Sequence, residues 1–193
     1  MSLQPKPSLS LDEWIEQERN ALEARCEYVH GEVFAMTGAS ADHNTIVMNI
    51  GRELSTQMKG KPCQVYANDM KVVIRAADAG KYPDLLAYCG PPEFSDGRRD
   101  VLLNPSLIVE VLSPSTEAYD RGDKFALSRQ IPSLREYLLV SQDRARVELY
   151  ERGEAGRWIL TEYAALTDEV ALPSIACTLP LSEIYDKVEC LRS

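Results

Sequence analysis

The chain has 193 residues, of which 45% are hydrophobic and 26% are charged, as in a globular protein of about one domain. No run of about 18 apolar residues occurs and the N-terminus lacks the apolar core of a signal peptide, so we expect a cytoplasmic protein without a transmembrane helix. The net charge of -9 counts against general affinity for nucleic acids. It leaves room for a local basic groove, which could be lined by Arg98, Arg99, Arg121, Lys124, Arg129 and Arg135.

Cysteine and histidine content restricts the kind of metal site that the chain can build. Five cysteines without a CxxC pair favour reduced, mostly buried thiols over disulfides or a zinc knuckle. The two histidines are too few for a zinc cluster. Any metal site is therefore expected to be rich in oxygen ligands, which favours Mg²⁺ or Mn²⁺.

The first third of the chain predicts a helix, a hairpin and a longer helix. After a loose lead over residues 1–9, Ser10 is suited to cap a helix over 11–20, with Glu13 as its capping-box partner. A hairpin over 26–36 is expected to turn near the His-Gly pair at 30–31. A helix over 42–59, capped by Ser40 or Asp42, carries one apolar stripe at helical spacing. The stripe consists of Ile46, Val47, Ile50, Leu54 and Met58.

The rest of the chain predicts mainly strands, with one helix between them. That helix spans 119–131 and ends at Pro132. The strands are expected at 63–67, 70–75, 82–88, 106–112, 136–141, 145–151 and 157–164, followed by a final strand and a short helix at 181–188. The order of elements predicts one α+β (α/β-like) domain over residues 1–193, in which helices flank a central mixed sheet and a hairpin lies near the N-terminus.

Two acidic residues stand at apolar strands. Asp84 follows Pro83 at the mouth of the strand 82–88, and Glu110 lies inside the run Leu-Ile-Val-Glu-Val-Leu. If the two strands are neighbours in one sheet, the two carboxylates can meet. Because close carboxylates repel, one must be protonated or a cation must bind between them. A divalent metal that activates water and polarises a phosphodiester would suit this pair.

Three further residues are candidates for the same site. Lys124 lies on the apolar side of the helix 119–131, where its ammonium group needs an anionic partner and could orient an attacking water. Glu27 could add a carboxylate from the hairpin. His43 opens the helix 42–59 and could position a group or transfer a proton.

Each candidate also has a purely structural interpretation. Pro83-Asp84 could simply begin a strand, and Glu110 could point outward from an edge strand. Lys124 could pair with Asp120, four residues earlier on the helix, which is compatible with a role in a site. His43 could be a packed histidine, and Glu27 could be a solvated hairpin residue.

Taken together, these residues resemble the PD-(D/E)XK nuclease superfamily, and more closely its Uma-type restriction endonuclease family. The similarity spans roughly residues 10–188. The residues that carry it are Glu27-Tyr28-Val29-His30-Gly31-Glu32, His43, Tyr82-Pro83-Asp84, Val109-Glu110-Val111-Leu112-Ser113, Ser115-Thr116, Asp120, Lys124 and Glu136-Tyr137-Leu138.

The resemblance implies a restriction-endonuclease-like fold and a Mg²⁺- or Mn²⁺-dependent nuclease. Asp84, Glu110 and the backbone carbonyl of Val111 would be metal ligands, and Lys124 would be the catalytic lysine. The superfamily's plain motif has its lysine two residues after the glutamate, where this chain has Leu112. The Uma-type pattern moves it to the helix, which fits Lys124, and usually has a tyrosine one turn later, where this chain has Ser128.

Three functions follow as hypotheses. The first is a magnesium-dependent endonuclease that hydrolyses DNA, for which a homodimer would supply two sites for two strands. The second is an inactive protein of the same fold that binds a partner, and the third is a metal-dependent phosphohydrolase of small nucleotides. Binding to DNA should weaken steeply as salt rises, whereas nucleotide hydrolysis should not.

Overall fold

The computed structural model describes residues 9–22, 24–36 and 38–189. The expected loose lead at residues 1–9 lies, apart from Leu9, outside the described residues. The helical segments are α1 (Leu11–Asn20), α2 (Ala41–Met58), α3 (Glu117–Tyr119), η2 (Asp120–Lys124), α4 (Phe125–Ser128) and α5 (Leu181–Ile184), with short turns η1 (Arg75–Ala77), η3 (Glu154–Gly156) and η4 (Pro173–Ile175).

The larger sheet has six strands in the order β11-β10-β9-β8-β6-β3. Strand β8 runs parallel to β9, whereas the other neighbouring pairs are antiparallel. The sheet is therefore mixed, as the order of elements predicted. Its strands are β3 (Cys63–Ala67), β6 (Leu85–Cys89), β8 (Leu107–Leu112), β9 (Glu136–Ser141), β10 (Val147–Arg152) and β11 (Trp158–Tyr163).

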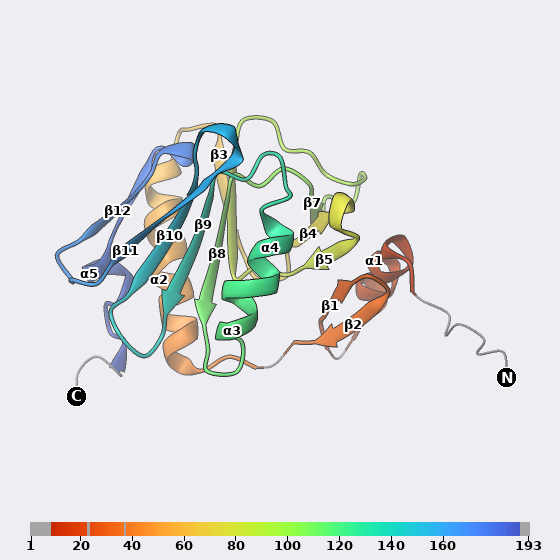
Figure 1. Ribbon diagram of the computed structural model, residues 1–193, viewed down its shortest axis with the longest axis horizontal. Helices are drawn as coiled ribbons and strands as arrows, with labels where there is room; N and C mark the ends of the chain where they lie inside the picture. Colours follow the sequence, from red (N-terminus) through yellow and green to blue (C-terminus); the bar gives the residue numbers. More distant parts are fainter. Residues whose placement is uncertain (1–8, 23, 37, 190–193) are drawn as a thin grey trace, which may run out of the picture.

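A second sheet of five strands, in the order β2-β1-β5-β4-β7, lies beside the larger one (Figure 1). It contains the predicted N-terminal hairpin, which turns at His30 and Gly31. A separate pair, β12 with β13, completes the strands. The strands of these two sheets are β1 (Cys26–Val29), β2 (Glu32–Ala35), β4 (Lys71–Ile74), β5 (Ala79–Lys81), β7 (Val101–Leu102), β12 (Glu169–Leu172) and β13 (Cys177–Pro180).

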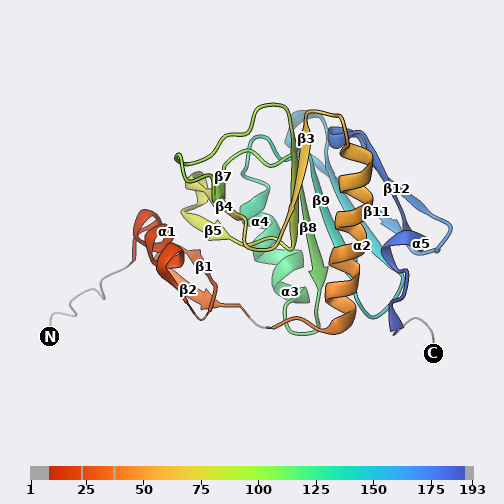
Figure 2. The same cartoon turned by 180° about the vertical axis from the view of Figure 1, so that it is seen from behind.

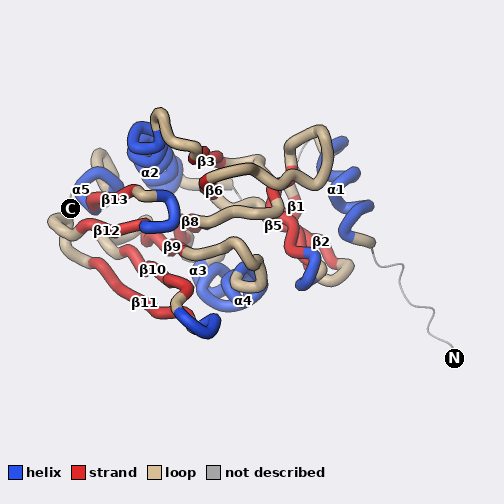
Figure 3. The backbone as a smooth tube through the Cα atoms, turned by 90° about the horizontal axis from the view of Figure 1, so that it is seen from above, coloured by secondary structure: helices blue, strands red, loops and turns tan. Residues whose placement is uncertain are grey.

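The larger sheet is covered on both faces. Helix α2 lies on one face together with α5 and the β12–β13 pair, and the segment α3–η2–α4 lies on the other (Figures 1 and 3). The side chains of β8 alternate between these layers. Val109 and Val111 pack in the core that includes α2, whereas Ile108 and Leu112 pack in the core that includes α4. Glu110 shares the side of Ile108 and Leu112, and so faces α3–η2–α4.

The two predicted helix starts have the expected capping contacts. The Ser10 side chain accepts a hydrogen bond from the Glu13 amide, and the Glu13 carboxylate accepts one from the Ser10 amide, which completes the capping box. At α2, the cap is Ser40 rather than Asp42, because the Ser40 hydroxyl accepts from the His43 amide. All five members of the predicted apolar stripe of α2 are buried, which confirms that prediction.

Several predicted boundaries differ from the structure. The expected strand 82–88 begins only at Leu85, as β6, because Pro83 has no amide to donate to a ladder. Strand β5, which ends at Lys81, was not predicted. The expected final strand is two strands, β12 and β13, and helix α5 is shorter than predicted. The expected helix 119–131 runs instead over Glu117–Ser128, and its middle segment, η2, is π-helical.

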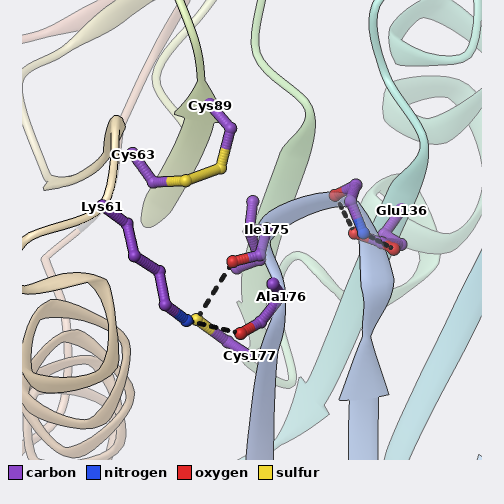
Figure 4. The surroundings of a disulfide bond; sticks show 8 residues. Lys61, Cys63, Cys89, Glu136, Ile175, Ala176 and Cys177 are labelled. Atoms are coloured by element: carbon purple, nitrogen blue, oxygen red, sulfur yellow. Dashed lines mark hydrogen bonds between the residues drawn. A yellow bond between two sulfur atoms is a disulfide. The ribbon is translucent and has the colours of Figure 1, made fainter.

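The prediction of reduced thiols is wrong for two cysteines. Cys63 on β3 and Cys89 on β6 lie directly opposite each other and form a disulfide, with their Cα atoms 4.0 Å apart (Figure 4). No local pattern of residues indicates this pairing, because it depends on the register between the two strands. Cys26 and Cys177 are thiols, and the Cys177 Sγ contacts the carbonyl of Ile175. Cys190 lies outside the described residues.

Seen from behind, α2 runs along the strands of the larger sheet, on the face opposite to α3 and α4 (Figure 2). Across the part of the chain that the structure describes, no helix combines the length and the apolar character needed to cross a bilayer.

Gly80 marks a close approach between β5 and α1 and provides a test of the packing there. A Cβ atom at this position would overlap the ring of Trp14, whose side chain is fully buried. Gly80→Ala should therefore lower the free energy of unfolding by about 1–3 kcal/mol, the usual cost of overpacking. Chemical denaturation measures this change. Gly97→Ala is the control, because nothing lies near its Cβ position, and an equal loss in both variants would contradict the packing argument.

Candidate metal-dependent active site

Asp84 lies in the segment between β5 and β6, next to the C-terminal half of β8. Its Oδ2 atom accepts a hydrogen bond of 2.7 Å from the amide of Val111 and lies 3.2 Å from the His43 Nε2 atom. His43 reaches this position because the Ser40 cap fixes the first turn of α2. The structure therefore brings Asp84, the Val111 amide and His43 together.

Glu110 is buried in the centre of the larger sheet, with only 3% of its surface exposed. Strand β8 lies between β6 and β9, so the interpretation of Glu110 as an outward residue on an edge strand is wrong. One carboxylate oxygen, Oε2, lies 2.9 Å from the Lys124 Nζ atom. The other, Oε1, is buried and has no hydrogen-bond partner among the described residues. An unsatisfied carboxylate oxygen at such a depth is costly unless a further cation or water meets it.

Lys124 lies at the C-terminal end of η2 and is almost completely buried. Its Nζ atom contacts three carboxylates, at 2.9 Å from Glu110, 3.2 Å from Glu27 and 3.6 Å from Asp120. The predicted pair with Asp120 coexists with the contact to Glu110. Short π-helical segments are frequent at functional sites, where they re-aim side chains.

Glu27 is buried, not solvated, which overturns the structural interpretation of this residue. Its carboxylate joins the hairpin to the rest of the cluster. Atom Oε1 lies 3.2 Å from the Lys124 Nζ atom and accepts a 3.3 Å hydrogen bond from the Tyr82 amide. Atom Oε2 lies 3.2 Å from the Lys81 Nζ atom and accepts a 3.2 Å hydrogen bond from the Tyr119 hydroxyl.

Lys81 and Tyr119 are members of this cluster that sequence reasoning missed. Lys81 is 1% exposed, and its ammonium also donates to the Tyr119 hydroxyl. Lys81 can reach Glu27 because β5 pairs with β1, with Tyr28 opposite Gly80. Only knowledge of this strand register would have placed Lys81 opposite Glu27, and no local sequence signal supplies it.

The pKa shifts follow from burial and from these contacts. Burial raises the pKa of the Glu110 carboxyl well above its usual range, and Asp84 and Asp120 add to this effect against the pull of Lys124. Burial lowers the pKa of Lys124, but the carboxylates of Glu110, Glu27 and Asp120 outweigh it, so the pKa is raised and the ammonium stays charged.

Burial alone would raise the pKa of Glu27, but the ammonium groups of Lys124 and Lys81 reverse the effect and lower it. Glu27 is therefore held in its ionised form. Asp120 behaves differently, because burial raises the pKa of its carboxyl despite the nearby Lys124. The two glutamates that share Lys124 thus have pKa values displaced in opposite directions.

The cluster contains more acidic than basic side chains. It contains four carboxyl groups but two ammonium groups, those of Lys81 and Lys124. If all four carboxyls are ionised, two negative charges remain to be balanced. Within the described ranges, no three His, Cys, Asp or Glu side chains are grouped as ligands of one ion. A cation here would therefore take few side-chain ligands and complete its shell with main-chain oxygen and water, as Mg²⁺ commonly does.

The residues around the cluster differ from expectation in two respects. Two arginines that could have lined a basic groove are engaged by carboxylates, Arg98 by Glu16 and Arg121 by Glu117 and Glu148. Ser128 stands where a tyrosine was expected, and its hydroxyl donates a 2.7 Å hydrogen bond to the carbonyl of Lys124. The hydroxyl of Tyr137, from β9, donates to the carbonyl of Asp120 at 3.2 Å. These two hydroxyls hold the backbone of η2 in place.

Comparison with known proteins reveals the relatives of this chain. Residues 11–182 match the model of the Uma2 family, described as "Putative restriction endonuclease". Two uncharacterized proteins of Synechocystis sp. are each 35% identical to the chain. The protein sll1609 aligns over 84% of this chain and 91% of its own length, and slr1290 over 94% and 93%.

A solved structure has the same fold at low sequence identity. It is the crystal structure of "a putative nuclease belonging to DUF820" from Anabaena variabilis, with a TM-score of 0.75 and 16% identity. The alignment covers 92% of this chain and 97% of the Anabaena chain. The α+β fold with mixed sheets is therefore a nuclease-like fold, as predicted. From the matched family model and the two relatives, the chain belongs to the Uma2 family.

Proposed function

We propose that this protein is a Mg²⁺- or Mn²⁺-dependent endonuclease that hydrolyses DNA phosphodiester bonds. The observation that carries the proposal is the buried Glu110 carboxyl group. Its Oε1 atom has no hydrogen-bond partner among the described residues, its Oε2 atom meets the Lys124 ammonium, and the charge of Asp84 acts on it. The residues fit a hard divalent cation, because the donors are oxygens and the cluster has more carboxyl than ammonium groups. Membership of the Uma2 family supports the same activity.

Asp84, Glu110 and the main-chain carbonyl of Val111 would hold the cation. When bound, such an ion polarises the phosphodiester and lowers the pKa of an attacking water. His43 orients Asp84 through its Nε2 atom, and the Val111 amide fixes the same carboxylate from β8. The role of these two neighbours is to keep Asp84 in one position while substrate enters and leaves.

Lys124 would act on the reacting groups directly. Its ammonium is charged and can orient the attacking water or stabilise the charge that develops on the phosphoryl oxygens. Glu27 holds Lys124 from the side of the hairpin, at 3.2 Å. In this arrangement both sheets contribute residues to the site, since β8 supplies Glu110 and β1 supplies Glu27.

The number of strands cut depends on how many sites meet one duplex. A single site would nick one strand at a time, whereas two sites in a homodimer could cut both strands together. We propose that the whole chain acts as one domain and pairs with a second copy on duplex DNA. A plasmid substrate distinguishes nicked from linear product.

Cleavage of supercoiled plasmid in the presence of Mg²⁺ or Mn²⁺ tests the activity. Asp84→Asn and Glu110→Gln should each abolish metal-dependent cleavage, because each removes a ligand charge without changing side-chain size. Lys124→Met should lower turnover by on the order of 10²–10³-fold, the typical cost of losing a group that stabilises transition-state charge. Circular dichroism of each variant establishes that the fold is retained.

The control is Glu169→Gln, which removes an exposed carboxylate on β12. It should cleave as well as the parent. Cleavage by Glu110→Gln at the parent's rate would overturn the assignment of the site. Metal-dependent hydrolysis of nucleotides without any cleavage of DNA would indicate a small-nucleotide phosphohydrolase, and binding of DNA without cleavage would indicate an inactive member of the fold.

Thermal unfolding measures metal binding without activity. A ligand that binds only the folded state stabilises it by about 2.7 kcal/mol at a concentration of 100 times its Kd. Mg²⁺ should therefore raise the Tm of the parent and of Lys124→Met, but not that of the Asp84→Asn/Glu110→Gln double variant. An equal rise in the double variant would place the cation elsewhere.

A further inference from the structure

We propose that Lys81 is a positioning residue which neutralises Glu27 and thereby allows Lys124 to turn from the buried carboxylates toward an anionic substrate. This inference rests on the proposed phosphodiester hydrolysis and concerns the same site. It assigns a task to a second buried lysine that contacts none of the candidate metal ligands.

Lys81 lies deep in the protein, beside Glu27. It ends β5, three residues before Asp84, and its side chain is almost fully enclosed. The Nζ atom lies 3.2 Å from the Glu27 Oε2 atom and donates to the hydroxyl of Tyr119, which in turn donates to the same carboxylate oxygen. Because only 1% of Lys81 is exposed, it is too deep to meet a large substrate itself. Its influence passes through Glu27, directly and by way of the Tyr119 hydroxyl.

The two carboxylate oxygens of Glu27 contact two different lysines. Oε1 faces Lys124 and the Tyr82 amide, whereas Oε2 faces Lys81 and the Tyr119 hydroxyl. Each oxygen thus has one ammonium and one further donor. The carboxylate would remain paired through Oε2 if Lys124 moved away from Oε1.

A phosphate would compete with three carboxylates for Lys124. Its single ammonium is shared by Glu110, Glu27 and Asp120. If no other cation were present, turning Lys124 toward a phosphate would leave Glu27 charged and buried without a charged partner, which is strongly unfavourable. Lys81 removes most of that cost because it stays with Glu27. The site therefore uses two lysines with different roles: Lys124 turns to the substrate, and Lys81 keeps Glu27 paired.

A double-mutant cycle tests this coupling. Lys81→Met keeps a linear side chain of similar size but removes the charge, so it should lower kcat for plasmid cleavage by about 10–100-fold, as loss of an outer-shell partner typically does. KM and its salt dependence should stay unchanged. In a Glu27→Gln background the same substitution should have little further effect, because the carboxylate that Lys81 serves is absent.

Two further measurements separate positioning from a purely structural role. The rise in Tm with Mg²⁺ should persist in Lys81→Met, because the metal ligands are untouched. Lys71→Met is the matched control. Lys71 lies on β4 of the same sheet and is also buried, and its Nζ atom lies 3.1 Å from the Asp100 Oδ2 atom. It should lower the Tm but leave the kcat of the folded protein unchanged.

The outcomes are distinct. An active parent whose Lys81→Met variant keeps full kcat, or loses kcat additively with Glu27→Gln, overturns the role of Lys81 and leaves the proposed nuclease standing. Loss of the Mg²⁺-dependent rise in Tm in Lys81→Met also overturns it, because Lys81 would then support the metal site itself. A parent that hydrolyses no phosphodiester overturns the proposed function and this inference together.

Discussion

The ammonium group of Lys124, enclosed by three carboxylates, is the interaction on which the site depends. Glu110 comes from the larger sheet, Glu27 from the hairpin of the smaller sheet, and Asp120 from the same helical segment as Lys124. Removing water from so many charges is costly, and such a cluster is weak support for stability in itself. The cluster brings together residues from separate elements at this cost. Such an arrangement fits a role in chemistry better than a role in stabilising the fold.

The fold delivers these groups by ordinary means. Alternation along β8 turns Glu110 away from α2 and toward η2, and pairing of β1 with β5 sets Lys81 near Glu27. The apolar neighbours of Glu110 on β8 are buried on both faces of the sheet, so a single carboxylate within the run meets a dry environment. That environment is the reason for the raised pKa of its carboxyl group.

Local signals allowed much of the fold and part of the site to be predicted. The capping box at Ser10, the apolar stripe of α2 and the acidic residue within an apolar run each depend on a few neighbouring residues, and the structure has each where expected. Lys81 and the disulfide between Cys63 and Cys89 depend on strand register over long sequence separations, which local patterns do not encode. The burial of Glu27 was missed for the same reason.

The location of a bound cation is the most direct test of the account. Crystals grown or soaked with Mn²⁺ would reveal the ion through its anomalous scattering. We expect a peak within about 2.0–2.2 Å of carboxylate oxygens of Asp84 and Glu110, the range for small divalent cations bound by oxygen. A well-ordered crystal at saturating Mn²⁺ with no peak between these two carboxylates, or with peaks only elsewhere, would contradict a metal-dependent site at the junction of the two sheets.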